Sequence, residues 1–321
     1  MSTFRKKIKK ILGKVVRCLP NIFKRKLIEG LTIFVYHEIS DRPSKFAELH
    51  GLAVSLESFR KQIQWIKSNF KVIHPRDLLS GDKLPKEAAL ISFDDGFLGS
   101  FENGLAILEE MEAPSIHFLN MQAILEQKPV LSATTCFLEE NVPDFLKFTK
   151  EFNIQYPFHL TLTPSDLGVF EEKYGIINNK AVLEYQGDFA DLNEIKKWEN
   201  KRLVTFGNHL YDHWNVAALT HDELEQQYKK TETELSQFKN SINFFAFTNG
   251  QPGSCFSAND VTFLEYLGAE KVFSASGGGN IDTSDFLLRR MSLYEWDVDE
   301  DYIWFQLGWA KLSDLLSKAS K

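Results

Sequence analysis

The hydrophobic positions of the chain alternate between short continuous runs and runs with helical spacing. Residues 31–36 and 88–93 are apolar stretches rich in β-branched and aromatic residues, typical of buried strands. Between them, Ser55 precedes a segment in which apolar residues recur every three or four positions up to Phe70, which predicts an amphipathic helix. Strands alternating with helices predict an α/β protein with a parallel sheet, open or closed into a barrel. Further strands are predicted at residues 72–73, 115–119, 203–206, 244–247 and 272–274.

Two segments depart from this alternation. Residues 121–200 are rich in Glu, Asp, Asn, Phe and Pro and predict short helices and loops, an insertion in the α/β body. After it, Thr220 followed by Glu223 forms a capping box that predicts the start of another helix. We therefore divide the chain into an N-terminal amphipathic helix (residues 1–30), a body (31–300) and a C-terminal amphipathic helix (301–321).

Charge is distributed unevenly along the chain. The net charge is −7, yet residues 1–28 hold ten basic residues and no acidic one, which leaves 27 basic against 44 acidic residues in the rest. An acidic body argues against nucleic acid as a partner, because phosphate binding needs Lys and Arg across the contact face. In the basic segment, apolar residues recur at helical spacing until Pro20. Such a helix either lies on an anionic membrane surface or packs its apolar side on the body and leaves its lysines in solvent.

Cysteine content and the N-terminal pattern bear on location. The three cysteines (Cys18, Cys136 and Cys255) lie far apart without a CxxC pair, which excludes a disulfide scaffold and a cysteine-rich zinc site and fits a reducing compartment. The basic N-terminal segment lacks the apolar core of a secretory signal. We expect a cytoplasmic protein, peripheral at the inner face of the cytoplasmic membrane if the basic helix binds lipid.

Titratable residues gather where predicted strands end. Strand 88–93 leads directly into Asp94 and Asp95, and two adjacent carboxylates are costly unless a divalent cation or a shared proton neutralises them. Strand 203–206 leads to His209 and His213, whose spacing can place both imidazoles on one side of a helical turn. Asp95 with the two histidines would leave coordination positions open for water and substrate. Taken singly, the paired aspartates also fit a turn and the histidine pair a solvated surface.

Several segments are similar to motifs of one family, the polysaccharide deacetylases, also known as NodB-homology or carbohydrate esterase family four enzymes. The resemblance extends from about residue 31 to 295, apart from the insertion. It rests on Tyr36-His37, residues 91–96 (ISFDDG), 207–220 (GNHLYDHWNVAALT), 245–250 (FAFTNG), 273–280 (FSASGGGN) and 288–291 (LRRM).

The resemblance implies a distorted (β/α) barrel of about seven parallel strands, with the mostly helical insertion capping its mouth. It implies that Asp95, His209 and His213 hold a divalent metal, most simply Zn²⁺, and that Asp94 is the general base. A metal lowers the pKa of its water and polarises the carbonyl, while a carboxylate held off the metal takes the proton.

Other roles follow less directly. His37 is the candidate proton donor to the leaving amine, since a histidine beside carboxylates can stay protonated near neutral pH; the alternative is a buried histidine that ends a strand. Asn249 and Gly250 could offer a backbone N–H to the oxyanion. Arg290 either pairs with Asp94 and keeps it ionised or forms a surface salt bridge.

The expected activity is metal-dependent removal of an N-acetyl or other acyl group from a saccharide that is polymeric, lipid-linked or nucleotide-linked, in polysaccharide or glycolipid biosynthesis. Leu210 and Thr248 depart from the family pattern, and no I-x-L-x-H histidine follows near the C-terminus. The alternatives are a catalytically degraded saccharide-binding or scaffolding protein and a hydrolase of a non-sugar amide. His159 in the insertion is expected to be structural, and His50 to lie in a loop without a partner.

Overall fold

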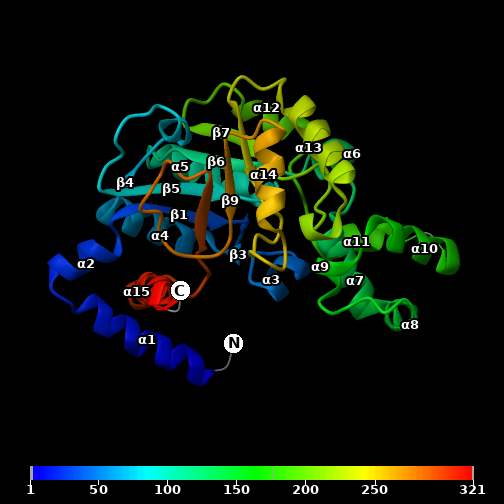
Figure 1. Cartoon of the computed structure of the whole chain (residues 1–321), viewed down its shortest axis with the longest axis horizontal. Helices are drawn as coiled ribbons and strands as arrows, with labels where there is room; N and C mark the ends of the chain where they lie inside the picture. The colour runs from blue at the N-terminus through cyan, green and yellow to red at the C-terminus, as the bar shows by residue number, and fades with distance from the viewer. Residues whose placement is uncertain (1–2, 176, 320–321) are drawn as a thin grey trace.

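A closed barrel of seven parallel strands forms the centre of the computed structural model, which describes residues 3–175 and 177–319 (Figure 1). The barrel closes because β1 pairs with β5 on one side and with β10 on the other. This confirms the distorted (β/α) barrel expected from the sequence. The barrel strands are β1 (Gly30–Tyr36), β5 (Glu87–Phe93), β6 (Ser115–Leu119), β7 (Val204–Asn208), β8 (Ser241–Ala246), β9 (Lys271–Ser274) and β10 (Leu287–Ser292). β4 (Lys71–Val72) pairs with the first half of β5.

Successive residues of a barrel strand face opposite sides of the sheet, as β1 shows. In β1, Leu31 and Ile33 belong to the cluster inside the barrel, whereas Phe34 and Tyr36 belong to the cluster between the barrel and its helices. This alternation is the period of two that every strand imposes on its side chains. Every second residue of a strand therefore points into the barrel, and the same alternation extends to the residues just beyond the strand ends.

Helices cover the outside of the barrel. The predicted helix after Ser55 is α4 (Leu56–Asn69), and the Ser55 hydroxyl accepts a hydrogen bond from the Ser58 N–H. The predicted capping box of Thr220 is also present at the start of α13 (His221–Leu235). The smaller elements of the body are β2 (Glu38–Ile39), α3 (Lys45–His50), β3 (Ala53–Val54), η1 (Pro75–Leu78), η2 (Ser100–Gly104), α5 (Leu105–Glu110), η3 (Val216–Ala218) and α14 (Ala258–Tyr266).

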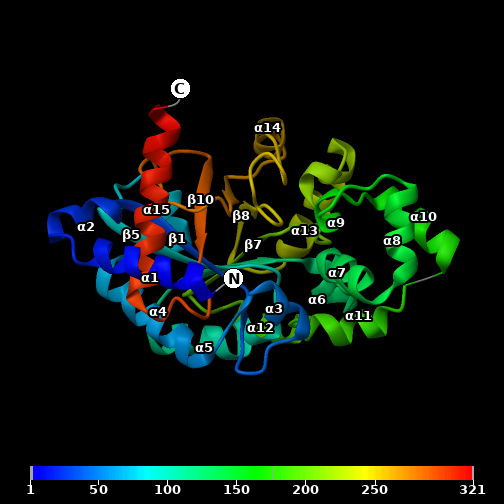
Figure 2. The same ribbon diagram turned by 90° about the horizontal axis from the view of Figure 1, so that it is seen from below.

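The expected helical insertion lies to one side of the barrel, opposite the two terminal segments (Figures 1 and 2). Its aromatic residues pack on one another; the Phe145 and Phe170 rings, for example, meet edge to face at 5.5 Å. Asn215 ties the insertion to the barrel, since its side-chain amide donates a hydrogen bond to the Leu160 carbonyl at 2.6 Å. The helices are α6 (Met121–Glu126), α7 (Leu131–Asn141), α8 (Pro143–Glu151), α9 (Phe158–Thr161), α10 (Pro164–Tyr174), α11 (Asn179–Gln186) and α12 (Leu192–Trp198).

The two ends of the chain pack against each other. α1 (Thr3–Arg17) is followed by α2 (Asn21–Leu27) and packs crosswise against α15 (Glu300–Ala319), which lies between it and the barrel (Figures 1 and 2). Within the described part of the chain, no helix combines the length and the hydropathy that crossing a membrane requires.

The short strands β2 and β3 are absent from the predicted strands, and two barrel strands differ clearly from the expectation. β8 begins at Ser241, three residues before the predicted range, with Asn243 exposed at its outer face. β10 is absent from the predicted strands, because the arginines at positions 289 and 290 interrupt its apolar pattern. One of these two arginines, Arg290, points into the barrel and has a role in the site described below.

Candidate functional site

Polar side chains meet at the edge of the barrel where the parallel strands end. In β1, β5 and β7 every second residue points into the barrel. The next position in each series, just beyond the strand, is occupied by His37, Asp94 and His209 respectively. The strands are held in register there, since the Asp94 N–H donates to the Tyr36 carbonyl at 3.0 Å. Parallel strands bring such residues to one edge regardless of their separation in sequence. The predicted convergence of residues 94–95 with residues 209–213 is thereby explained.

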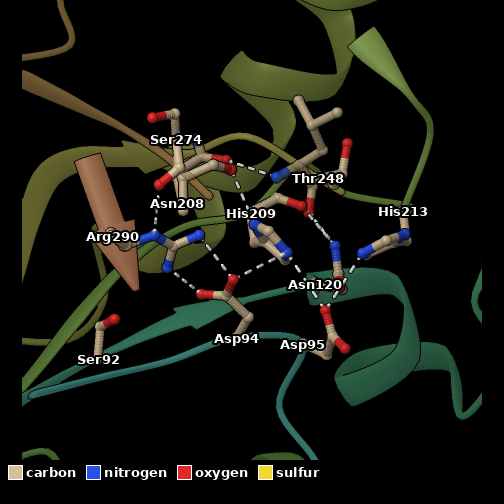
Figure 3. A network of polar contacts seen from close by, with 12 residues as sticks. Ser92, Asp94, Asp95, Asn120, Asn208, His209, His213, Thr248, Ser274 and Arg290 are labelled. Carbon is tan, nitrogen blue, oxygen red and sulfur yellow. Dashed lines mark hydrogen bonds and ion pairs between the residues drawn. The ribbon is translucent and has the colours of Figure 1, made fainter. Parts of the chain in front are cut away.

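Asp95, His209 and His213 form a compact buried group (Figure 3). Oδ1 of Asp95 lies 3.2 Å from Nε2 of His209 and 3.2 Å from Nε2 of His213. The three candidate ligand atoms all lie within 4.8 Å of one another. One carboxylate and two imidazoles in this arrangement suit a first-row divalent metal with open positions.

The backbone turns sharply at Asp95 to aim its carboxylate at the histidines. Asp95 has the opposite parity to Asp94, but its φ of 73° lies in the left-handed region, as does the φ of 102° at Gly96. The Gly96 N–H closes this turn on the Asp94 carbonyl at 2.9 Å. A left-handed residue other than glycine costs about 1–2 kcal/mol, and such strain is common where a side chain must be positioned for function.

Hydrogen bonds orient His209. Its Nδ1 lies 2.8 Å from the Ala246 carbonyl; because a carbonyl oxygen only accepts, Nδ1 is the donor in this bond, and Nε2 is the ring nitrogen that faces Asp95. Asn120 donates from its side chain to the His209 carbonyl and to the Leu210 carbonyl, the latter at 3.3 Å. Leu210 has a φ of 65°, and its N–H donates to Oδ1 of Asn208 at 2.9 Å.

Neither Asn120 nor Asn208 was singled out from the sequence. Asn120 directly follows β6, and it continues the series of Ile116 and Phe118, which point into the barrel. The alternation that places Asp94 at the barrel edge therefore also places Asn120 there. Asn208 precedes His209 and carried no separate signal.

The electrostatics of the buried group fit a divalent cation. Burial alone would raise the pKa of Asp95, but His213 and His209 outweigh it and hold that pKa well below its usual range. Burial lowers the pKa of His213, whereas Asp95 raises it, with a net increase. Oδ1 of Asp95 and Nδ1 of His213 are buried without a hydrogen-bond partner among the described residues. A cation between Asp95 and the two Nε2 atoms would supply that carboxylate oxygen with the partner it lacks.

Arg290 and Asp94 form a buried bidentate pair. Nη1 and Nη2 of Arg290 donate to Oδ1 and Oδ2 of Asp94 at 2.6 and 2.7 Å, and the arginine side chain has no exposed surface. The pair is therefore internal, which removes the alternative of a surface salt bridge. Burial would raise the pKa of Asp94, but the charges of Arg290 and His209 outweigh it and lower that pKa. Oδ2 of Asp94 lies 4.0 Å from Nε2 of His209.

His37 lines the same cavity, and two opposing effects act on the pKa of its ring. Burial lowers the pKa of His37, and the nearby carboxylates of Asp95 and Asp94 only partly oppose this. Desolvation is thus the larger effect on this ring, and the role of His37 as proton donor stays a prediction.

The loop after β8 corrects one part of the expected oxyanion site. The Gly250 N–H donates to the Thr248 carbonyl at 2.6 Å, so it is already used within the loop. A side chain at Gly250 would meet Ala275 at 2.7 Å, and its φ is +70°, so glycine is required there. Asn249 lines the cavity, and its side-chain nitrogen is buried without a hydrogen-bond partner among the described residues. Its side chain, rather than the Gly250 backbone, is therefore the donor available to a ligand.

The cavity above these residues has a volume of about 360 Å³. His159 of α9 and His50 of α3 both line it, although neither was expected to contribute to the site. Burial lowers the pKa of His159 to about 4, which leaves the ring neutral at neutral pH. The remaining lining outside the strand ends includes Phe46, Leu52, Ser132, Cys136, Leu160, Gln251 and Cys255.

Comparisons with known proteins agree with this geometry. The family model for polysaccharide deacetylase matches residues 81–270, more than half of the chain. The search of curated proteins found no match to this chain.

Solved structures share the fold at low sequence identity. IcaB from Ammonifex degensii has a TM-score of 0.57 at 14% identity, covering 87% of this chain and 97% of its own. The Streptococcus pyogenes deacetylase PplD, solved with acetate, has a TM-score of 0.57 at 13% identity, covering 87% and 98%. A de-N-acetylase from Aggregatibacter actinomycetemcomitans has a TM-score of 0.52 at 15% identity, covering 81% and 94%. With the family match over residues 81–270, the motifs and the barrel site in place, this chain belongs to the polysaccharide deacetylase family.

Proposed function

We propose that this protein hydrolyses the acetamide of an N-acetylated sugar within a saccharide, in a reaction that depends on a divalent metal, with zinc as the metal. The observation that carries the proposal is the buried group of Asp95, His209 and His213 beside the Asp94–Arg290 pair, all facing one cavity. Membership of the deacetylase family supports the acetylated saccharide as substrate.

Asp95, His209 and His213 would hold the metal. A divalent metal bound there would lower the pKa of a water molecule and polarise the amide carbonyl. The three residues are suited to this because the pKa of Asp95 is held well below its usual range and the bond from Nδ1 of His209 to the Ala246 carbonyl leaves Nε2 facing Asp95.

Asp94 acts as the base. Its carboxylate is held ionised by Arg290 and lies next to the metal-binding group without belonging to it. The oxygens that accept from Arg290 keep further lone pairs, and Oδ2, near His209, can take a proton from the attacking water. Arg290 also fixes the plane of the carboxylate, since a bidentate pair allows only one orientation.

His37 supplies a proton to the leaving nitrogen. Burial lowers the pKa of this ring, which suits a relay: His37 takes the proton that Asp94 has removed from the attacking water and passes it to the leaving nitrogen, so that one proton moves from water to the amine overall. The side chain of Asn249 donates a hydrogen bond to the substrate, which gives its buried nitrogen the partner it lacks. Among the described residues, no feature favours the non-catalytic alternative, because the ligand set and the base are all in place.

Metal analysis of an Asp95→Asn variant, combined with an acetate-release assay on acetylated oligosaccharides, tests the proposal. We expect the variant to lose bound metal and activity, because an amide is a far weaker ligand than a carboxylate. Wild-type activity should disappear with a chelator and return with zinc. An Asp82→Asn variant, in an exposed loop, serves as the matched control. Undiminished zinc in Asp95→Asn, or chelator-resistant acetate release, would refute the proposed site.

A further inference from the structure

The larger apolar side chains of α1 face solvent instead of the protein body. Ile11 and Val15 are 63% and 59% exposed, and Ile8 and Leu12 are 42% and 45% exposed. These positions share one face of the helix, since they recur at three- and four-residue spacing. Surface helices of globular proteins ordinarily bury such a face. The interpretation in which the apolar face packs on the body is therefore contradicted by the structure.

A different face of α1 holds it against α15. A side-chain carbon at Gly13 would lie 1.6 Å from the Asp301 carbonyl oxygen, so the two backbones are in direct contact there. A carbon at Gly308 would lie 3.0 Å from the Val16 side chain. Ion pairs add to this contact, because Arg17 binds Asp301 at 2.9 Å. Small residues and charge pairs thus fix α1 in place and leave its apolar face outward.

The next helix also exposes large apolar side chains. In α2, Ile22 and Phe23 are 67% and 53% exposed. We call the exposed apolar residues of α1 and α2 the terminal surface. Figure 1 shows α1 on the outside of the molecule, with α15 between it and the barrel.

Basic side chains accompany the terminal surface. Lys14, Arg25 and Lys26 are exposed, and Lys14 lies within the apolar stretch of α1. The segment of residues 1–28 has ten basic residues and no acidic one, although the rest of the chain is strongly acidic. An exposed apolar face with cations beside it is complementary to a surface in which negatively charged groups lie above an apolar layer.

We propose that the terminal surface docks on an anionic lipid bilayer, with its apolar side chains at the acyl boundary and its lysines and arginines among the phosphates. A second copy of the chain is a poorer occupant. Lys10 and Arg17 are paired with Asp299 and Asp301, but a twofold contact through this surface would still bring the exposed Lys14, Arg25 and Lys26 of two copies towards each other.

Co-sedimentation of the full chain with phosphatidylcholine vesicles, with and without phosphatidylglycerol, tests this proposal. We expect binding only with phosphatidylglycerol, weakening as salt is raised. An Ile11→Ser/Val15→Ser variant should bind the vesicles at least about tenfold more weakly than the wild type, because two apolar anchors are lost. A Lys14→Glu/Arg25→Glu variant should lose about tenfold or more in affinity through charge alone. Ile281→Ser, at a side chain 64% exposed elsewhere, is the matched control.

Failure of this proposal can be distinguished from failure of the proposed function. The measurement uses no substrate, and Asp95→Asn should bind vesicles like the wild type. Equal pelleting of the wild type and Ile11→Ser/Val15→Ser would overturn the proposal. So would self-association of the lipid-free wild type that this double variant abolishes, because the surface would then be an interface between copies.

Discussion

The two walls of the catalytic cavity differ in charge. The wall formed by the barrel strand ends holds Asp94, Asp95 and Arg290, which are buried and ionised. The wall formed by the insertion is neutral, since burial raises the pKa of the Cys136 thiol to about 12 and lowers that of His159 to about 4. Charge is therefore concentrated where bonds would be broken, and the insertion offers shape and neutral polar groups.

The walls also differ in how their residues are positioned. Strand-end residues are set by the hydrogen-bond ladder of the barrel, as in the bond from Asp94 to the Tyr36 carbonyl. Insertion residues depend on side-chain packing and on single tethers such as the Asn215–Leu160 bond. The first arrangement holds a geometry to within fractions of an ångström, whereas the second can be altered with little harm to the barrel. The comparison therefore predicts that the strand ends carry the reaction and that the insertion selects the substrate.

Replacing the base should have the largest effect on activity. In Asp94→Asn the side chain keeps its size but cannot accept a proton, so acetate release should fall by about 10²–10⁴-fold. Metal content should stay near that of the wild type, because Asp94 lies outside the ligand group. Activity and bound zinc would be measured together, with Asp82→Asn as the control. A loss of zinc equal to that of Asp95→Asn would show that Asp94 belongs to the metal site.

Breaking the buried pair should chiefly reduce stability. Arg290→Met leaves the Asp94 carboxylate buried without its partner, and such a change costs about 3–5 kcal/mol. The pKa of Asp94 is lowered in the native protein, so the pair stabilises the fold above the pKa of an unfolded aspartate and loses this effect as the pH falls through the native pKa. In the variant, burial instead raises the pKa of Asp94, which penalises the fold at neutral pH.

Urea denaturation at neutral and acidic pH measures this difference. The gap in unfolding free energy between the wild type and Arg290→Met should be largest near neutral pH and shrink towards about pH 4. The double variant Asp94→Asn/Arg290→Met should recover part of the loss, because no buried charge remains unpaired. A gap that is the same at all pH values would mean that Arg290 acts through packing alone.

The strand-end wall could be predicted from the sequence because local pattern and chemistry coincide there. Apolar runs locate β5, and the residues that follow a buried strand must lie at its end. Arg290 shows the limit of this method, since two arginines conceal β10 in the hydrophobic pattern. The resemblance suggests a pair with Asp94, but only the structure, in which Asp94 faces Arg290 from 196 positions away in the chain, decides between this pair and a surface salt bridge. Gly250 shows another limit, because the use of its N–H depends on the conformation of one loop.

The insertion wall could not be predicted in this way. His159 lies in a short helix between loops, and no strand register fixes where its ring points. Its place in the cavity depends on how α9 packs beside η3, a long-range contact that leaves no periodic signal. His50 is similar, since it ends α3 and reaches the cavity through the packing of that helix.

Replacing His159 should give the smallest effect and sharpen the contrast between the walls. The ring is neutral at neutral pH, so His159→Ala removes at most a hydrogen bond and some contact area, worth about two- to tenfold in the KM for an oligosaccharide. Because the substrate is held less well but the strand-end groups are untouched, kcat and bound zinc should change little, and the effect should be constant from about pH 6 to 8.

His159→Gln should restore part of the loss. His221→Ala is the matched control, since that ring stacks on Phe263 outside the cavity. A fall in kcat comparable to that of Asp94→Asn would place His159 among the reacting groups, and the division between a reactive barrel wall and a recognising insertion would then be wrong.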